Sequence, residues 1–166
     1  MVYTSWLPTF QEQGWVVCSP VAPDGNLFFR GSERYLPQIM DHIEDQVNLA
    51  GGKFYLFGVS NGGISAFRVA TLNPERFHSL TVLPGWPKPA DEKRLDTLIN
   101  MPVNFLVGEL DGRWREKSKL FHDRIASMGG DSTLEVIPGE GHTAFHSIQV
   151  QRLLQIIQRN HQRLRT

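Results

Sequence analysis

Short apolar runs separated by longer amphipathic stretches are the feature that most restricts the fold of this 166-residue chain. Most of the runs are nearly continuously apolar and rich in β-branched or aromatic residues, which is typical of strands buried on both faces. They predict strands over residues 15–19, 54–59, 79–83, 103–107 and 133–137. Cys18 lies within the first run, so we expect it to be a buried strand residue.

The stretches between these runs predict helices. Residues 35–50, for example, carry Leu36, Met40 and Ile43 at helical spacing. The predicted helices cover residues 5–13, 35–50, 61–72, 91–99, 114–128 and 145–163, and the first of them begins at a Ser5 cap. Strands alternating with helices predict an α/β fold, a mostly parallel sheet flanked by helices on both faces. Without a repeat or linker, a chain of this length predicts a single domain over residues 1–166.

Composition and charge exclude several function classes. The 17 basic and 17 acidic side chains cancel, so the chain does not have the charge typical of proteins that bind nucleic acid or an anionic membrane. One cysteine excludes an internal disulfide. No apolar stretch has the length of a membrane span and no signal peptide is recognised, which predicts a cytoplasmic protein. No metal-ligand spacing or cofactor motif is present, so we predict neither a metal nor a cofactor.

A serine between glycines follows the second predicted strand, in Gly58-Val59-Ser60-Asn61-Gly62-Gly63. Gly-x-Ser-x-Gly between a strand and a helix is the pattern of a nucleophile elbow, in which side chains at positions 58 and 62 would collide. The turn places the serine hydroxyl at a helix N-terminus, where free N–H groups favour an oxyanion. The alternative interpretation is a glycine-rich turn with a capping serine.

A nucleophilic serine needs a base, and the base needs an acid that orients it. Asp111 follows the fourth predicted strand, and His142 follows the fifth in Gly139-Glu140-Gly141-His142. The order Ser, Asp, His along the chain is the order that this architecture requires. Glu109 is a rival for the acid, and Asp111 has an alternative role as a helix cap. For His146 we expect a surface or packing role.

Together these motifs resemble the α/β-hydrolase superfamily, from Trp15 to the C-terminus of the chain. The similarity extends to small serine esterases, including polyhydroxyalkanoate-depolymerase-like, feruloyl-esterase-like and carboxylesterase- or thioesterase-like members. The Ser-Asn-Gly-Gly form of the elbow is also similar to that of prolyl-oligopeptidase-type serine peptidases, which stay an alternative.

The resemblance implies a role for each motif residue. Ser60 would attack a small ester or thioester, His142 would act as general base and then acid, and Asp111 would orient His142. The backbone N–H of Asn61 would donate to the oxyanion. Trp86 would border the acyl pocket, with ordinary packing an equal alternative. We expect Trp114 to anchor its helix in the core. Residues 84–102 are too few for a lid domain.

The resemblance is incomplete at the N-terminus. In the family, a third strand lies between the strands that correspond here to residues 15–19 and 54–59, and its His-Gly loop supplies a second oxyanion donor. No such segment precedes residues 5–13. Three explanations stay open: a fragment, a partner chain or homo-oligomer that completes the sheet, or a short substitute strand at residues 1–4. A catalytically incomplete protein that acts by binding is therefore the second hypothesis, beside an active hydrolase.

Overall fold

A parallel sheet forms the centre of the computed structural model, which describes residues 6–142 and 147–163. Its strands are β1 (Phe54–Val59), β2 (Phe77–Leu83), β3 (Val103–Gly108) and β4 (Ser132–Ile137). They lie in the order β1-β2-β3-β4, and each neighbouring pair is parallel. All the carboxyl ends therefore meet at one edge of the sheet, and the predicted mostly parallel α/β fold is confirmed.

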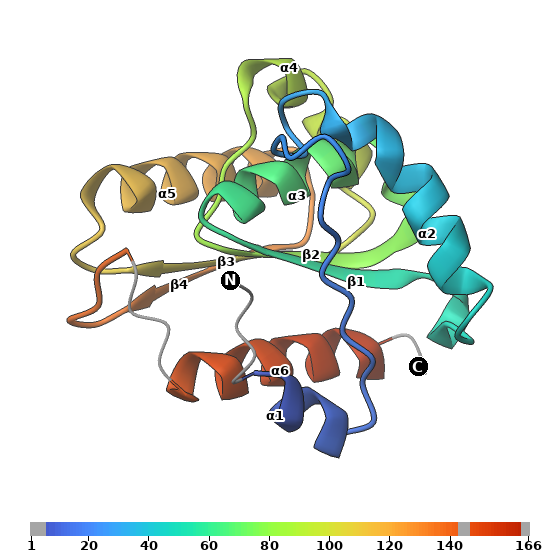
Figure 1. Ribbon diagram of the computed structural model, residues 1–166. Helices are drawn as coiled ribbons and strands as arrows, with labels where there is room; N and C mark the ends of the chain where they lie inside the picture. Colours follow the sequence, from blue (N-terminus) through green and yellow to red (C-terminus); the bar gives the residue numbers. More distant parts are fainter. Residues whose placement is uncertain (1–5, 143–146, 164–166) are drawn as a thin grey trace.

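Helices cover both faces of the sheet (Figure 1). On one face lie α2 (Leu36–Glu44), α3 (Asn61–Leu72), α4 (Pro89–Glu92) and α5 (Gly112–Ser127), and on the other lie α1 (Leu7–Glu12) and α6 (Ser147–Gln162). Short 3-10 segments cover Ser32–Tyr35, Ala50–Gly52, Pro74–Arg76 and Leu95–Leu98. The crossovers between successive strands pass through α3, then α4, then α5, as the alternating pattern predicted.

Two predicted helices differ from the observed ones. The helix expected over residues 35–50 ends at Glu44. The apolar pattern that predicted a longer helix continues to Val47, but Val47 lies beyond the helix and lines a groove. The helix expected over residues 91–99 is divided into α4 and the 3-10 segment Leu95–Leu98. The Ser5 cap and the substitute strand at residues 1–4 lie outside the described residues.

Each face of the sheet has its own apolar core. The core under α2, α3 and α5 contains Phe67, Leu80, Phe105 and Ile125, all of them fully buried. The core under α1 and α6 is formed by buried residues of both helices and of two strands, namely Trp6, Phe10, Leu83, Leu106, Val150, Leu153, Leu154, Ile156 and Ile157. Strands buried on both faces explain why the apolar runs of β2 and β3 show no alternation.

The strand predicted over residues 15–19 is wrong, because this segment forms no strand beside β1. Its side chains alternate between two environments. Trp15 and Val17 pack against the α6 core, and the Trp15 ring meets the edge of the Tyr55 ring at 5.2 Å, whereas Val16 is 68% exposed. Cys18 is exposed as well, so its predicted burial is also wrong. The apolar run covers one side of a core instead of filling a strand position.

A groove of about 510 Å³ lies along β1, at the edge of the sheet. Its lining comes from the segment around Trp15, from α2 and from β1, and includes Ile39, Ile43, Val47, Phe54 and Leu56. In the described part of the chain, β1 pairs with β2 alone, so β1 is an edge strand. The groove contains no residue of the Ser60 elbow.

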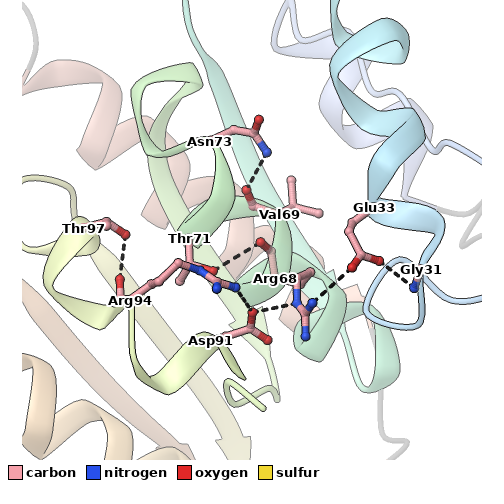
Figure 2. A network of polar contacts seen from close by, with 9 residues as sticks. All are labelled: Gly31, Glu33, Arg68, Val69, Thr71, Asn73, Asp91, Arg94 and Thr97. Carbon is pink, nitrogen blue, oxygen red and sulfur yellow. Dashed lines mark hydrogen bonds and ion pairs between the residues drawn. The ribbon is translucent and has the colours of Figure 1, made fainter. Parts of the chain in front are cut away.

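A buried ion network ties α3 to two surface segments (Figure 2). Arg68 of α3 contacts Glu33 at 3.0 Å and Asp91 of α4 at 2.6 Å. Arg94 contacts the same Asp91 carboxylate at 2.7 Å. The Asp91 side chain is 0% exposed, so these cations balance a fully buried charge. The network fixes the segment before α2 and the segment after β2 against α3, the helix that follows Ser60.

Candidate active site

Ser60 occupies a strained turn between β1 and α3. Its φ of 55° and ψ of −118° make it the one non-glycine residue with positive φ in the described ranges. Such a backbone is costly for a residue with a side chain and persists where the surroundings enforce it. The carbonyl of Ser60 accepts the first hydrogen bonds of α3, from the N–H groups of Gly63 and Ile64. The turn thereby puts the hydroxyl at the carboxyl edge of the sheet and at a helix N-terminus.

Close backbone contacts explain the glycines around this turn. A Cβ on Gly58 would lie 2.2 Å from the carbonyl oxygen of Gly62, and one on Gly63 would lie 2.3 Å from the carbonyl oxygen of Pro84. A Cβ on Gly85 would in turn lie 2.7 Å from the carbonyl carbon of Gly63. At Gly62, in contrast, a Cβ would meet no atom within 4 Å, so the predicted collision is correct for position 58 and wrong for position 62.

The structure brings Ser60, His142 and Asp111 into one hydrogen-bonded chain, although they come from three separate loops. Ser60 Oγ lies 2.8 Å from His142 Nε2, and His142 Nδ1 lies 2.8 Å from Asp111 Oδ2. A carboxylate accepts hydrogen bonds, so Nδ1–H of His142 donates to Asp111. Nε2 is then unprotonated and accepts a hydrogen bond from the Ser60 hydroxyl. The Asp111 side chain is 8% exposed and that of His142 is 31% exposed.

The two loops that carry the acid and the base are packed against each other. The N–H of Leu110 donates to the carbonyl of Glu140 at 2.8 Å, which joins the loop after β3 to the loop after β4. A Cβ on Gly108 would lie 2.3 Å from the same carbonyl, so the close approach requires glycine at this position. This contact sets the distance between Asp111 and His142.

The alternatives for the acid are not supported by the contacts of their side chains. The carboxylate of Glu109 accepts the N–H of Gly139 at 2.9 Å and so braces the loop after β4. Asp111 does occupy the N-cap position of α5, but its side chain makes no capping hydrogen bond there. His146 lies outside the described residues. The backbone N–H of Asn61 is in the first turn of α3, ahead of the first donors with an intrahelical acceptor.

Two tryptophans are connected to His142 by successive ring contacts. The ring of Trp114 lies 4.5 Å from the ring of His142, and the ring of Trp86 lies 4.1 Å from that of Trp114. Trp86 contacts the Ser60 site only through Trp114, and its 9% exposed side chain belongs to the core, as the packing alternative expects; its role as a pocket wall stays a prediction. Trp114 packs against the core as expected, and its contact with His142 was missed. The sequence prediction began this helix at residue 114, whereas α5 begins at Gly112, so the one-turn spacing between Asp111 and Trp114 was not visible in it.

Neither a metal cluster nor a membrane helix is found in the described ranges. Residues 6–142 and 147–163 hold no group of three or more His, Cys, Asp and Glu side chains that could bind a metal. No helix in these ranges is long and apolar enough to span a membrane.

Comparisons with known proteins give similarity at the level of structure. No family model and no curated protein matches the sequence. Among solved structures, SOBER1 of Arabidopsis thaliana, in a variant form, matches with a TM-score of 0.65 and 18% identity over 86% of this chain and 68% of its own. Esterase PE8 matches with a TM-score of 0.64 and 21% identity over 77% of this chain. This chain has the α/β-hydrolase fold.

Acyl-protein thioesterase 2 of Zea mays is a further structure with this fold, at a TM-score of 0.56 and 15% identity over 78% of this chain and 66% of its own. The match with esterase PE8 spans 60% of that protein's length. Identities this low establish the α/β-hydrolase fold, and the chemistry has to be argued from the side chains at the carboxyl edge of the sheet.

Proposed function

We propose that the protein is a serine hydrolase that cleaves a carboxylic ester or thioester. Ser60 attacks the carbonyl carbon while His142 takes its proton, and Asp111 holds the resulting imidazolium in place. The leaving alcohol or thiol takes the proton from His142 as the acyl-enzyme forms. Water, deprotonated by His142, then releases the acid and restores Ser60.

The observation that carries this proposal is the hydrogen-bonded chain from Ser60 Oγ through His142 to Asp111, with 2.8 Å at each contact. Packing alone does not require a serine at positive φ, a half-exposed histidine and a buried aspartate to converge from three loops. The N–H of Asn61 faces the same edge and is the proposed oxyanion donor; loss of one such donor typically slows acyl transfer about 100- to 1,000-fold.

The choice of ester or thioester substrates has two supports. Residues 84–102 form the short α4 and a 3-10 segment, which leaves the Ser60 site open to small soluble substrates. Fold neighbours named as an esterase and an acyl-protein thioesterase are consistent with the same class. A peptidase of the prolyl-oligopeptidase type remains the alternative for the same three residues, and it would also cleave amides.

Labelling with a fluorophosphonate tests the proposal. Wild-type protein is expected to gain one adduct by intact mass, and Ser60→Ala is expected to gain none while keeping the wild-type circular dichroism spectrum. Ser19→Ala, at an exposed serine remote from the elbow, is the matched control and should label like wild type. A folded wild-type protein without an adduct would replace this proposal with the binding-only hypothesis, and cleavage of a para-nitroanilide amide would favour the peptidase.

A further inference from the structure

Three cationic side chains surround two aromatic rings beside the Ser60 site. Lys88 Nζ lies 5.8 Å from the centre of the Trp86 ring and 5.5 Å from that of Phe29. The guanidinium of Arg113 lies 6.0 Å from the Trp86 ring, and that of Arg30 lies 5.3 Å from the Phe29 ring. We call Arg30, Lys88 and Arg113 the cationic rim.

A short series of ring contacts connects the cationic rim to the Ser60 hydroxyl. Trp86, under both Lys88 and Arg113, contacts Trp114 with its ring tilted by 57°, and the Trp114 ring in turn contacts that of His142. Arg113 and Trp114 are the second and third residues of α5, and Gly112 separates them from Asp111. Two ring contacts therefore separate the cationic rim from His142. Because Trp86 is only 9% exposed, a substrate bound at Ser60 would meet the rim cations and not the face of the Trp86 ring.

The three cations of the rim form no ion pair with a carboxylate, whereas most of the other arginines do. Between residues 6 and 142 and between 147 and 163, no ion pair joins Arg30, Lys88 or Arg113 to a carboxylate. Most carboxylates nearby in the chain are paired with other cations, and the exposed Glu116, three residues beyond Arg113 in α5, forms no ion pair with any of the three. Asp24 pairs with Arg34, Glu33 and Asp91 pair with Arg68, and Glu92 pairs with Arg124. Like charges that are not neutralised by an ion pair repel one another, and a bound anion would relieve that repulsion.

Contact with an aromatic face holds each cation in place without using its hydrogen-bond donors. A guanidinium over a ring still directs its N–H groups outward in a planar fork that matches a carboxylate. Lys88 is half-buried, and the Phe29 and Trp86 rings flank it, so its ammonium is more restrained than that of an exposed lysine. The rim thus presents oriented donors and positive charge near the catalytic centre.

From this arrangement we propose that the cationic rim binds a carboxylate on the substrate, so that the hydrolase prefers esters that carry an anionic group over neutral esters of the same shape. This inference rests on the proposed function for the hydrolytic step, but the binding of the anion does not. Lys88 and Arg113 would contact the carboxylate beside Trp86, and Arg30 would add attraction at longer range.

The test compares two esters that differ in one charge, para-nitrophenyl hydrogen glutarate and para-nitrophenyl methyl glutarate. For wild type at low salt, kcat/KM is expected to be about fivefold to tenfold higher for the anionic ester, since one exposed ion pair contributes up to about fivefold. The preference should shrink at high salt. Lys88→Gln/Arg113→Gln should remove it, whereas the control Lys93→Gln/Lys119→Gln, which also removes two lysine or arginine charges, should retain it.

A binding measurement separates this inference from the proposed function. Monomethyl glutarate should quench tryptophan fluorescence of Ser60→Ala, because Trp86 adjoins Lys88 and Arg113, and the quench should be absent when Lys88→Gln/Arg113→Gln is added. Hydrolysis of both esters without preference or quench would overturn the inference and leave the proposed function standing. A quench that depends on the rim, without hydrolysis of either ester, would support anion binding by the rim and overturn the proposed function. Equal ester preferences in the two double variants would also overturn the inference.

Discussion

At the scale of single residues, two carboxylates two positions apart serve different partners. Asp111 directs Oδ2 at His142 Nδ1, whereas Glu109 holds the N–H of Gly139. Both follow the same strand, so composition and position alone leave the choice between them open. The deciding factor is the path of the turn after β3, which returns toward β4 through the contact between Leu110 and Glu140.

Asp111→Asn is expected to lower kcat for ester hydrolysis about 1,000- to 10,000-fold, because an amide in place of the carboxylate favours the wrong tautomer of His142. Glu109→Gln is the matched control, and it should cost far less since a neutral oxygen can still accept the Gly139 N–H. Steady-state kinetics with a para-nitrophenyl ester measure both. A larger loss in Glu109→Gln would contradict the assignment of Asp111.

At the scale of elements, the order of strands and helices followed from the sequence because strands buried on both faces have a distinctive apolar pattern. The candidate site residues Ser60, Asp111 and His142 were predicted for the same reason, since each follows one of these strands. Residues 15–19 were misassigned because an apolar run that covers one side of a core resembles a buried strand. The contact of Trp114 with His142 depends on where α5 begins, which periodicity alone does not determine.

The junction of α3 with the loop after β2 allows a paired glycine test. Gly63→Ala is expected to destabilise the protein by about 1–3 kcal/mol, because its Cβ would lie 2.3 Å from the Pro84 carbonyl oxygen and force the backbones apart. Gly62→Ala, in open space in the same helix, should stabilise it by up to about 1 kcal/mol. Urea unfolding gives both free energies, and similar values for the two variants would refute the role of close packing.

The ion network of α3 and α4 predicts an asymmetry between two arginines. Arg68→Met leaves Asp91, with its 0% exposed side chain, paired with Arg94 alone, and should cost about 3 kcal/mol in the free energy of unfolding. Arg76→Met removes pairs with the more exposed Asp41 and Glu44 and should cost less than about 1 kcal/mol. Chemical denaturation compares them, and equal losses would mean that burial of Asp91 contributes nothing.

At the scale of the whole molecule, two cores on opposite faces share one sheet, and the titration of a single group on that sheet couples the stability of the whole to pH. His78 lies on β2 near the start of that strand, where its Nε2 is 2.7 Å from the carbonyl oxygen of Ala50. Burial is the main cause that lowers the pKa of His78 below its ordinary value of 6.5, and the charges of Lys53 and His161 add to it. The hydrogen bond to Ala50 acts in the opposite direction.

This direction fixes how His78 couples global stability to pH. The unfolded chain takes up a proton at His78 at a higher pH than the folded protein does, so acidification below about pH 6.5 favours unfolding. The contribution of His78 is fully present above the unfolded pKa and is lost as pH falls toward the folded pKa. His78→Gln keeps a donor for the Ala50 carbonyl but removes the titration, so it should lose less stability than wild type between about pH 7.5 and about pH 5.5. Urea unfolding at both pH values measures the difference. The same loss in both proteins would show that other groups carry the pH dependence, because the only property that His78→Gln is designed to change is the uptake of that proton.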